Sequence, residues 1–212
     1  IMLKKIRRRL KDHHPQKNTQ IQRKAAVLIP LLEIEDELLV MLTKRSKNLS
    51  SHAGQVSFPG GKKDSIEESS LETALRETYE EIGLKPEKVE ILGNLDQILS
   101  IQKYIVTPFV GLIPAEFKPI PNPDEIESVF KVPLSFFMKS SNHWVQEFQT
   151  STEKVFLHHF DFEGYDIWGL TAKLILRLLE IGLEHIPDFP VHHPDYPTWM
   201  QRALEYAEKK LS

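Results

Sequence analysis

Apolar runs of strand length, separated by short polar stretches, occupy much of the chain. Residues 25–32 and 37–42 are two such runs, and the polar stretch 33–36 between them predicts a β-hairpin. The same patterns predict further strands at about 89–99, 104–112, 125–132 and 154–162, and helices at 169–182 and about 196–211. Strands and helices that are mixed in this way, without repeats or low-complexity linkers, predict an α/β fold.

One further helix is expected to begin at Ser69 or Ser70 and to end at Ile82, with Gly83 as a left-handed C-cap. The polar face of this helix then carries the glutamates of its second half. The inward stripe has helical spacing and consists of Leu71, Ala74, Leu75, Thr78 and Ile82.

Three glutamates crowd the polar face of that helix. Glu77 and Glu81 are one turn apart, which places their β-carbons roughly 5–6 Å from each other, and Glu80 lies close beside them. Like charges so placed destabilise an isolated helix by roughly a few tenths of a kcal/mol per pair. A hard divalent ion such as Mg²⁺ or Mn²⁺ binds carboxylate oxygens and would turn this repulsion into ligation. The pattern therefore indicates a metal site.

The sequence before the helix gives the acidic cluster a frame. A turn ending in Gly60 and Gly61 lets backbone groups approach an ion or a phosphate closely, because glycine has no β-carbon. Arg76 is placed to reach back to Glu67 or Glu68 in the intervening loop. Such a charge-assisted pair would fix the loop against the helix.

The segment from Gly61 to Leu84 resembles the signature of the Nudix hydrolases, G-x5-E-x7-R-E-U-x-E-E-x-G-U, in which U is aliphatic. The match is strong from Arg76 onward. Two positions depart from the signature: six residues rather than five separate Gly61 from Glu68, and Thr78 replaces an aliphatic residue. The resemblance implies an α/β/α sandwich with a mixed sheet.

The resemblance also implies roles for the residues of the signature. Glu77 and Glu81 would be the principal ligands of Mg²⁺ or Mn²⁺, and Glu80 would be a further ligand or would hold a metal-bound water. The carbonyl of Gly61 would complete the metal shell, and Arg76 would belong to the catalytic set through its pair with the loop.

A second signature lies upstream of the first. Residues 41–46 and 54–61 resemble the pattern L-L-T-K-R-[S/A]-x3-R-x3-G-x3-F-P-G-G of the Nudix branch that hydrolyses coenzyme A. Met41 replaces the first leucine, and Ser50 stands where the pattern has arginine. A solvated strand end is the plainer interpretation of the cations, whereas the resemblance makes them phosphate contacts. The candidates for binding the substrate are Lys44, Arg45, Lys47, Gly60 and Gly61.

Another acidic segment, residues 124–130, resembles the short strand that brings a further glutamate to the metal in many Nudix enzymes. Glu125 is the position that aligns with it, and Glu125 or another glutamate would accept the proton of the attacking water. Strand alternation puts Glu127 on the same face, so Glu127 competes for this role. Two exposed acids on an edge strand are the alternative. Matches at 100–111 and 168–172 extend the resemblance over about residues 25–183.

The reaction implied is the hydrolysis of coenzyme A to 4'-phosphopantetheine and adenosine 3',5'-bisphosphate by a divalent-metal-dependent pyrophosphohydrolase. A Nudix hydrolase of another nucleoside diphosphate derivative, such as ADP-ribose, NADH or capped RNA, would share every catalytic residue. A non-enzymatic nucleotide-binding module is a third alternative. Such a module would usually have lost the glutamates of the signature, and here they are intact.

Composition agrees with a soluble metabolic enzyme. The chain has 212 residues, of which 41% are hydrophobic and 27% charged, as in an ordinary globular domain. Its net charge of −3 predicts no general affinity for nucleic acid or for anionic membranes. The absence of cysteine excludes disulfides and is compatible with the cytoplasm, where we expect the protein. A small-molecule substrate is the expected partner, and a homodimer is an open alternative to a monomer.

The two ends of the chain are expected to flank a Nudix domain at 25–185. Residues 1–24 are strongly basic, and Leu3, Ile6 and Leu10 give them the spacing of a short amphipathic helix. We expect this helix to pack on the core, and an anion-binding arm is the alternative. Residues 186–212 are rich in proline at their start and are expected to form a helical extension packed on the core.

Overall fold

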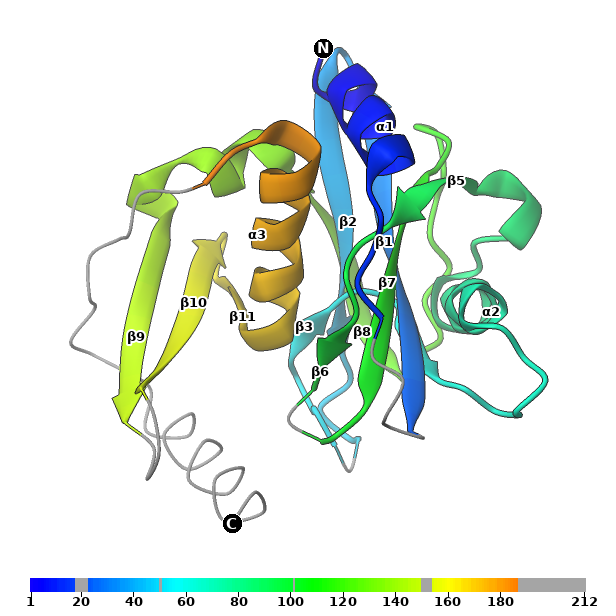
Figure 1. Ribbon diagram of the computed structural model, residues 1–212. Coiled ribbons are helices and arrows are strands. Elements are labelled where there is room, and N and C mark those ends of the chain that lie inside the picture. The colour runs from blue at the N-terminus through cyan, green and yellow to red at the C-terminus, as the bar shows by residue number, and fades with distance from the viewer. Residues whose placement is uncertain (18–22, 50, 101, 150–153, 187–212) are drawn as a thin grey trace.

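The computed structural model describes residues 1–17, 23–49, 51–100, 102–149 and 154–186 (Figure 1). Ser50 and the predicted helix at 196–211 lie outside these residues. No helix within the described ranges is long and apolar enough to cross a membrane. The helices are α1 (Met2–Asp12), α2 (Ser70–Ile82) and α3 (Gly169–Leu183), with short 3₁₀ helices η1 (Pro86–Lys88), η2 (Leu134–Met138) and η3 (Ser140–Asn142). The strands are β1 (Lys24–Ile34), β2 (Glu37–Arg45), β3 (Val56–Ser57), β4 (Gly60–Lys62), β5 (Glu90–Asn94), β6 (Ile98–Leu99), β7 (Ile105–Leu112), β8 (Ile126–Pro133), β9 (His143–Gln149), β10 (Lys154–Phe162) and β11 (Tyr165–Trp168).

Strand β1 organises the larger sheet because it pairs with three other strands. It runs parallel to β7 along most of its length, while its first residues pair with β4 and its last residues pair with β2, both antiparallel. The pairing with β2 is the predicted hairpin. Its turn residues Glu35 and Asp36 have φ angles of 49° and 64°, and a two-residue hairpin turn of type I′ requires positive φ at both positions. The sheet order is β3-β2-β1-β7-β5, with β8 paired to β2 and β6 to β7.

Side-chain alternation gives each face of this sheet its own core. Leu28 and Leu32 of β1 pack on the side of α2, where they meet Ile82. Ile29 and Leu31 pack in the opposite core, which also contains the apolar residues of α1 and α3. In Figure 1, α2 covers one face of the sheet, and α1 and α3 lie on the other. This arrangement confirms the predicted α/β/α sandwich with a mixed sheet.

A second sheet of three strands, in the order β11-β10-β9, packs beside α3 (Figure 1). Sequence patterns predict its middle strand, β10, but not β9 or β11. These two strands depend on cross-strand contacts: Trp144 of β9 and Trp168 of β11 both lie opposite the buried His159 of β10. The rings of Trp144 and His159 stack with their centroids 3.9 Å apart. Such pairing stabilises strands whose own sequences carry a weak pattern.

The single strand predicted at 89–99 is divided into β5 and β6. Asp96, which lies between them, forms hydrogen bonds with the segment that follows α1 and with α3. Its carboxylate accepts hydrogen bonds from the backbone N–H of Gln16 at 2.9 Å and from the guanidinium of Arg177. His13 lies 3.1 Å from the same carboxylate. The strand is therefore broken where a polar side chain joins the N-terminal segment to α3.

Helix α1 packs on the core through the apolar stripe that its sequence predicts. Ile6 and Leu10 are buried, and Ile6 lies so close to Gly182 of α3 that a β-carbon there would be 3.0 Å from its side chain. Lys5 and Arg9 donate hydrogen bonds to the last carbonyls of α3, those of Leu183 and Ile181, at 2.8 and 2.5 Å. These contacts support the expected docking of α1 on the core, and they occupy two cations that an anion-binding arm would need.

Candidate functional site

Helix α2 begins and ends where its sequence predicts. Ser69 caps the first turn by accepting a hydrogen bond from the backbone of Glu72, and the Glu72 side chain accepts one from the Ser69 N–H. Gly83 ends the helix with φ 74° and ψ 13°, a left-handed conformation that glycine adopts without strain. Thr78, which replaces an aliphatic residue of the signature, is fully buried, and its hydroxyl donates to the carbonyl of Ala74 at 2.6 Å.

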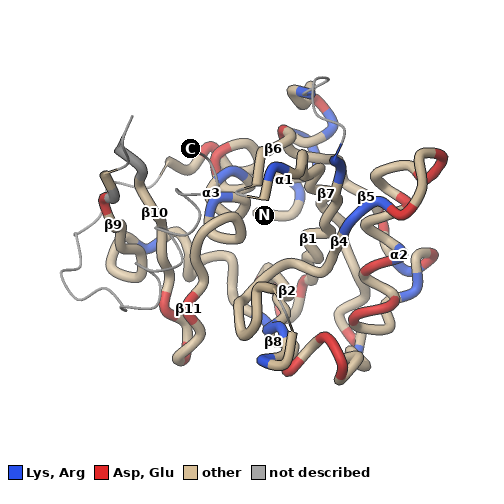
Figure 2. Tube along the Cα trace, turned by 90° about the horizontal axis from the view of Figure 1, so that it is seen from below, with Lys and Arg blue, Asp and Glu red and all other residues tan. Residues whose placement is uncertain are grey.

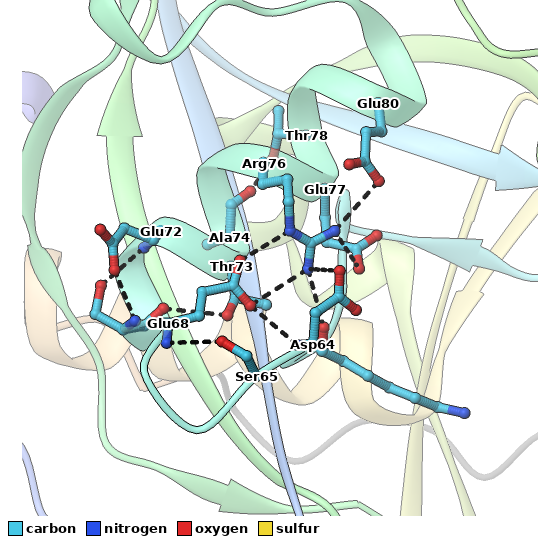
Figure 3. Close-up of polar contacts among 12 residues, drawn as sticks. Asp64, Ser65, Glu68, Glu72, Thr73, Ala74, Arg76, Glu77, Thr78 and Glu80 are labelled. Carbon is cyan, nitrogen blue, oxygen red and sulfur yellow. Dashed lines mark hydrogen bonds and ion pairs between the residues drawn. The ribbon is translucent and has the colours of Figure 1, made fainter.

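Arg76 lies at the centre of the polar network on α2 (Figure 3). Its guanidinium donates to Glu68 at 2.8 Å and to Glu77 and Glu80 at 3.2 Å each, and it also donates to the backbone carbonyl of Lys62 at 3.2 Å. The hydrogen bond from Arg76 lowers the pKa of Glu68 to about 2. Of the two glutamates that the sequence left open, the structure thus pairs Glu68 with Arg76.

Glu77 lies directly against the backbone of β4. A β-carbon on Gly61 would be only 2.3 Å from the carboxyl carbon of Glu77, so a side chain at this position would have to displace that carboxylate. Burial raises the pKa of Glu77, and the negative charges of Glu80 and Glu125 raise it further, against a lowering by Arg76. Gly60 and Gly61 lie in strand β4, paired with β1, and not in the turn that the sequence predicted. The Glu77 carboxylate therefore lies in contact with a glycine strand while its charge is only partly compensated.

Glu81 is buried, with 1% of its surface exposed, although the sequence placed it on a polar face. It follows the buried Thr78 by three residues and precedes Ile82, which puts it at the edge of the apolar stripe. Its carboxylate accepts hydrogen bonds from Arg45 at 3.1 Å and from the backbone N–H of Gly60 at 3.3 Å. Burial nevertheless raises its pKa to about 8, because these two donors offset only part of the desolvation.

Glu125 and Glu127 lie apart, although strand alternation predicted a common face. The register of β8 against β2 shifts between Lys44 and Arg45, so a β-bulge interrupts the alternation between the two acids. Glu127 forms an ion pair with Lys44 at 2.8 Å, whereas the charge of Glu125 raises the pKa values of both Glu77 and Glu81. Glu125 is therefore the acid of this segment that faces the cluster on α2.

Residues 22–149 of the chain match the sequence profile of the NUDIX domain. The chain belongs to this family. It is 41% identical to Nudix hydrolase 15, mitochondrial, of Arabidopsis thaliana over 82% of the chain and 64% of that relative. It is 36% identical to the peroxisomal coenzyme A diphosphatase NUDT7 of Mus musculus over 79% of the chain and 74% of the relative. Identity to the uncharacterized Nudix hydrolase NudL of Pectobacterium atrosepticum is 38%, over 74% of the chain and 81% of the relative. The chain spans less than two thirds of the plant relatives Nudix hydrolase 15 and Nudix hydrolase 22, at 64% and 60%.

The upstream cations of this Nudix chain are engaged with acids of their own. Lys44 pairs with Glu127 and Arg45 pairs with Glu81, while the charge of Lys47 contributes to the low pKa of Glu127. The Nε atom of Arg45 is buried and has no hydrogen-bond partner in the described part of the chain. Contact of these cations with a substrate stays a prediction. No sequence pattern indicated the pairing of Arg45 with Glu81, because the two residues are 36 positions apart.

The donor set of the Nudix site suits a hard divalent ion. Carboxylate oxygens and a backbone carbonyl are the ligands that Mg²⁺ and Mn²⁺ prefer, and Glu77, Glu80, Glu81 and Gly61 supply them. Within the described residues no three acidic or histidine side chains converge on one point, because Arg76 holds Glu77 and Glu80 while Arg45 holds Glu81. The carboxylates would have to exchange these arginines for an ion. The raised pKa values of Glu77 and Glu81 favour that exchange, because an ion supplies the charge compensation that both lack.

Proposed function

We propose that the protein is a Nudix pyrophosphohydrolase that depends on Mg²⁺ or Mn²⁺ and cleaves a diphosphate bond. One observation carries the proposal: two incompletely compensated carboxylates, Glu77 and Glu81, lie against the adjacent glycines of β4. A glycine strand beside a cluster of carboxylates provides a backbone approach for phosphate oxygens and a ligand set for a cation in one place. Membership of the NUDIX domain family agrees with this assignment.

Glu77 and Glu81 would hold the ion, with Glu80 and the carbonyl of Gly61 completing the set. When bound, such an ion neutralises diphosphate oxygens and makes hydroxide available near neutral pH. The chain's own residues support these ligands. Arg76 ties the loop before α2 to the helix through Glu68, so the ligands and the glycine strand keep their relative positions.

We assign the acceptance of the proton from the attacking water to Glu125. Its charge raises the pKa values of both Glu77 and Glu81, which places its carboxylate near the two principal ligands. Its backbone carbonyl accepts a hydrogen bond from the N–H of Ser46 at 2.8 Å, so the segment is fixed to the end of β2. Glu127 is bound to Lys44 and is less available for this role.

Coenzyme A or one of its derivatives is the substrate that we propose. The residues that resemble the coenzyme A branch lie in β2, β3 and β4 around the carboxylates, and NUDT7, a mouse relative at 36% identity, is named a coenzyme A diphosphatase. The products would be 4'-phosphopantetheine, or its acyl form, and adenosine 3',5'-bisphosphate. The cytoplasmic location stays a prediction, and relatives whose names state a compartment are mitochondrial, chloroplastic and peroxisomal.

A substrate panel tests this proposal. Coenzyme A, an acyl-coenzyme A, ADP-ribose, NADH and capped RNA would be incubated with the protein and Mg²⁺ or Mn²⁺, and the products identified by mass spectrometry. We expect the highest kcat/KM with coenzyme A or its thioester and no turnover in EDTA. A higher kcat/KM with ADP-ribose, NADH or capped RNA would mean that this compound, and not coenzyme A, is the substrate. The proposed cleavage of a diphosphate bond would still hold. Absence of metal-dependent cleavage across the panel would contradict the reaction itself.

A further inference from the structure

Three neighbouring strands bring two cations and one aromatic ring together at one end of the large sheet. Arg23 immediately precedes β1, Lys62 is the last residue of β4, and Tyr104 immediately precedes β7. The guanidinium carbon of Arg23 lies 5.8 Å from the centroid of the Tyr104 ring, and the ammonium of Lys62 lies 5.4 Å from it. Both distances are within the range of cation–π contacts, so both cations contact the same ring.

The backbone fixes the positions of all three residues. The carbonyl of Arg23 accepts a hydrogen bond from the N–H of Ile105 at 2.9 Å, and the carbonyl of Lys62 accepts one from Arg76 at 3.2 Å. Tyr104 is held in a tight turn, in which its N–H donates to the hydroxyl of Ser100 at 3.0 Å and its carbonyl accepts from the Ser100 N–H at 2.9 Å. Hydrogen bonds therefore fix the backbone at all three positions.

The register of the sheet relates this cluster to the carboxylates on α2. Lys62 lies opposite Ala25 of β1, and Ala25 lies opposite Val106 of β7, so these side chains share one face of the sheet. Gly61, the preceding residue, faces Glu77 on the other side. Lys62 and Gly61 are consecutive residues of β4, so the cation cluster and the carboxylate of Glu77 lie on opposite faces of the same short strand. In Figure 2, the basic stretch at β4 lies close to acidic positions of α2.

The charges of this cluster are uncompensated, in contrast to the upstream cations. Among the described residues, neither Arg23 nor Lys62 forms an ion pair or hydrogen bond with an acid, and both are exposed. Lys44 and Arg45 are already paired with Glu127 and Glu81. Two exposed cations that share one aromatic ring repel each other, and an anion bound between them would relieve the repulsion. A phosphate monoester suits them, since it accepts several charge-assisted hydrogen bonds at once.

We propose that Arg23, Lys62 and Tyr104 form a binding site for a phosphate monoester that the substrate carries outside the scissile diphosphate. The inference rests on the proposed function, and in coenzyme A this group is the phosphate on the 3'-oxygen of the ribose. Arg23 and Lys62 supply the charge, while Tyr104 holds both cations in place and offers a hydroxyl donor. The site would distinguish coenzyme A from nucleoside diphosphate derivatives that lack a further phosphate.

Binding of two product-like nucleotides tests the site directly. Isothermal titration calorimetry with Mg²⁺ would compare adenosine 3',5'-bisphosphate with AMP, which lacks the 3'-phosphate. The wild-type protein should bind the bisphosphate about tenfold or more tightly than AMP, the expected effect of charge-assisted contacts. Arg23→Gln and Lys62→Gln should each remove most of this preference and leave the affinity for AMP unchanged. Lys24→Gln is the matched control, because Lys24 is an exposed cation that follows Arg23 directly and begins β1, and this variant should retain the preference.

Three results would overturn the site: equal affinities of the wild-type protein for both nucleotides, equal losses for both nucleotides in Lys62→Gln, or a loss in Lys24→Gln as large as in Lys62→Gln. The last result would indicate a diffuse electrostatic field in place of a defined contact. Turnover of coenzyme A is measured separately. If coenzyme A were not cleaved, the proposed substrate would be wrong, whereas the nucleotide preference would still decide whether the phosphate site exists.

Discussion

Two clusters of charged side chains in this molecule contain similar residue types but have opposite balances of positive and negative charge. The α2 cluster consists of Arg45 and Arg76 with Glu68, Glu77, Glu80 and Glu81. The α1 cluster consists of Lys5 and Arg9 with Glu184 and the carbonyls of Ile181 and Leu183. Carboxylates outnumber cations in the first, and Glu81 is buried there; cations outnumber carboxylates in the second, which lies at the surface.

The difference separates a binding site from a structural contact. In the α1 cluster both cations interact with the carbonyl end of α3, where a positive charge is favourable, and every group has a partner. In the α2 cluster burial raises the pKa of Glu81 to about 8 in spite of Arg45, so the folded protein holds carboxylates without full compensation. Incomplete compensation of these carboxylates lowers the stability of the metal-free protein. Binding of a cation at this place is expected to restore that stability.

The strongest test removes charge from the α2 cluster. Glu77→Gln and Glu81→Gln should each lower kcat by orders of magnitude, because an amide oxygen does not supply the charge that holds the ion. The fold should stay intact, since each amide occupies nearly the same volume and Glu81 already favours its neutral form when no metal is bound. Steady-state kinetics at saturating Mg²⁺, with circular dichroism of each variant, measures both expectations.

Glu184→Gln is the matched control for these variants, because it makes the same chemical change in the α1 cluster. It should leave kcat and KM unchanged. Near-normal turnover in Glu77→Gln or Glu81→Gln at saturating Mg²⁺ would contradict the metal-binding role of the α2 cluster and would remove the basis of the comparison.

The second test concerns the docking of α1. Ile6→Ala should destabilise the protein by about 2–5 kcal/mol, because Ile6 is fully buried against α3 and its removal leaves a cavity. KM should be unchanged at every ionic strength. Urea unfolding gives the loss of stability, and kinetics across a salt series gives KM. An unchanged stability would contradict the docking of α1 on the core through Ile6.

Helix α2 and most of the long strands of the large sheet were predictable because their signals are local, whereas the short strands β3 and β4 were not predicted. The hairpin of β1 and β2, the cap residues Ser69 and Gly83, and the pairing of Arg76 with a loop glutamate all follow from residues a few positions apart. Strands β9 and β11 were missed because Trp144 and Trp168 are ordered by their contacts with His159 across the sheet. Cross-strand pairing of this kind leaves little trace in periodicity.

For the candidate site, the sequence indicated which residues take part, but not how they are buried or paired. The burial of Glu81 and its pairing with Arg45 join α2 to β2 over 36 positions, and only the packed sheet brings them together. The separation of Glu125 from Glu127 depends on a β-bulge, which strict alternation does not predict. The proximity of Arg23, Lys62 and Tyr104 likewise depends on the order of the strands in the sheet.

A third prediction uses pH to distinguish the two clusters. The pKa of Glu81 is raised from 4.5 to about 8 in the folded, metal-free protein, so the folded state binds its proton more tightly than the unfolded state. Stability should therefore fall as pH rises from about 5 to 8 in EDTA. Glu81→Gln should weaken this decline, and Mg²⁺ should reduce it because the ion replaces the proton. Thermal midpoints across this pH range measure the effect, and an identical decline in wild type and Glu81→Gln would contradict it.

The smallest effect is expected from the ion pairs of the α1 cluster. Glu184 contacts Lys5 at 3.1 Å and Arg9 at 2.7 Å, but its side chain is 56% exposed, so water screens both contacts. Glu184→Gln should lower the thermal midpoint by no more than about 2 °C at low salt, and the difference should vanish in about 1 M NaCl. Lys5 and Arg9 keep their carbonyl acceptors on α3 in this variant, which limits the loss. A decrease comparable with that of Ile6→Ala would mean that charge, and not the burial of Ile6 and Leu10, attaches α1 to the core.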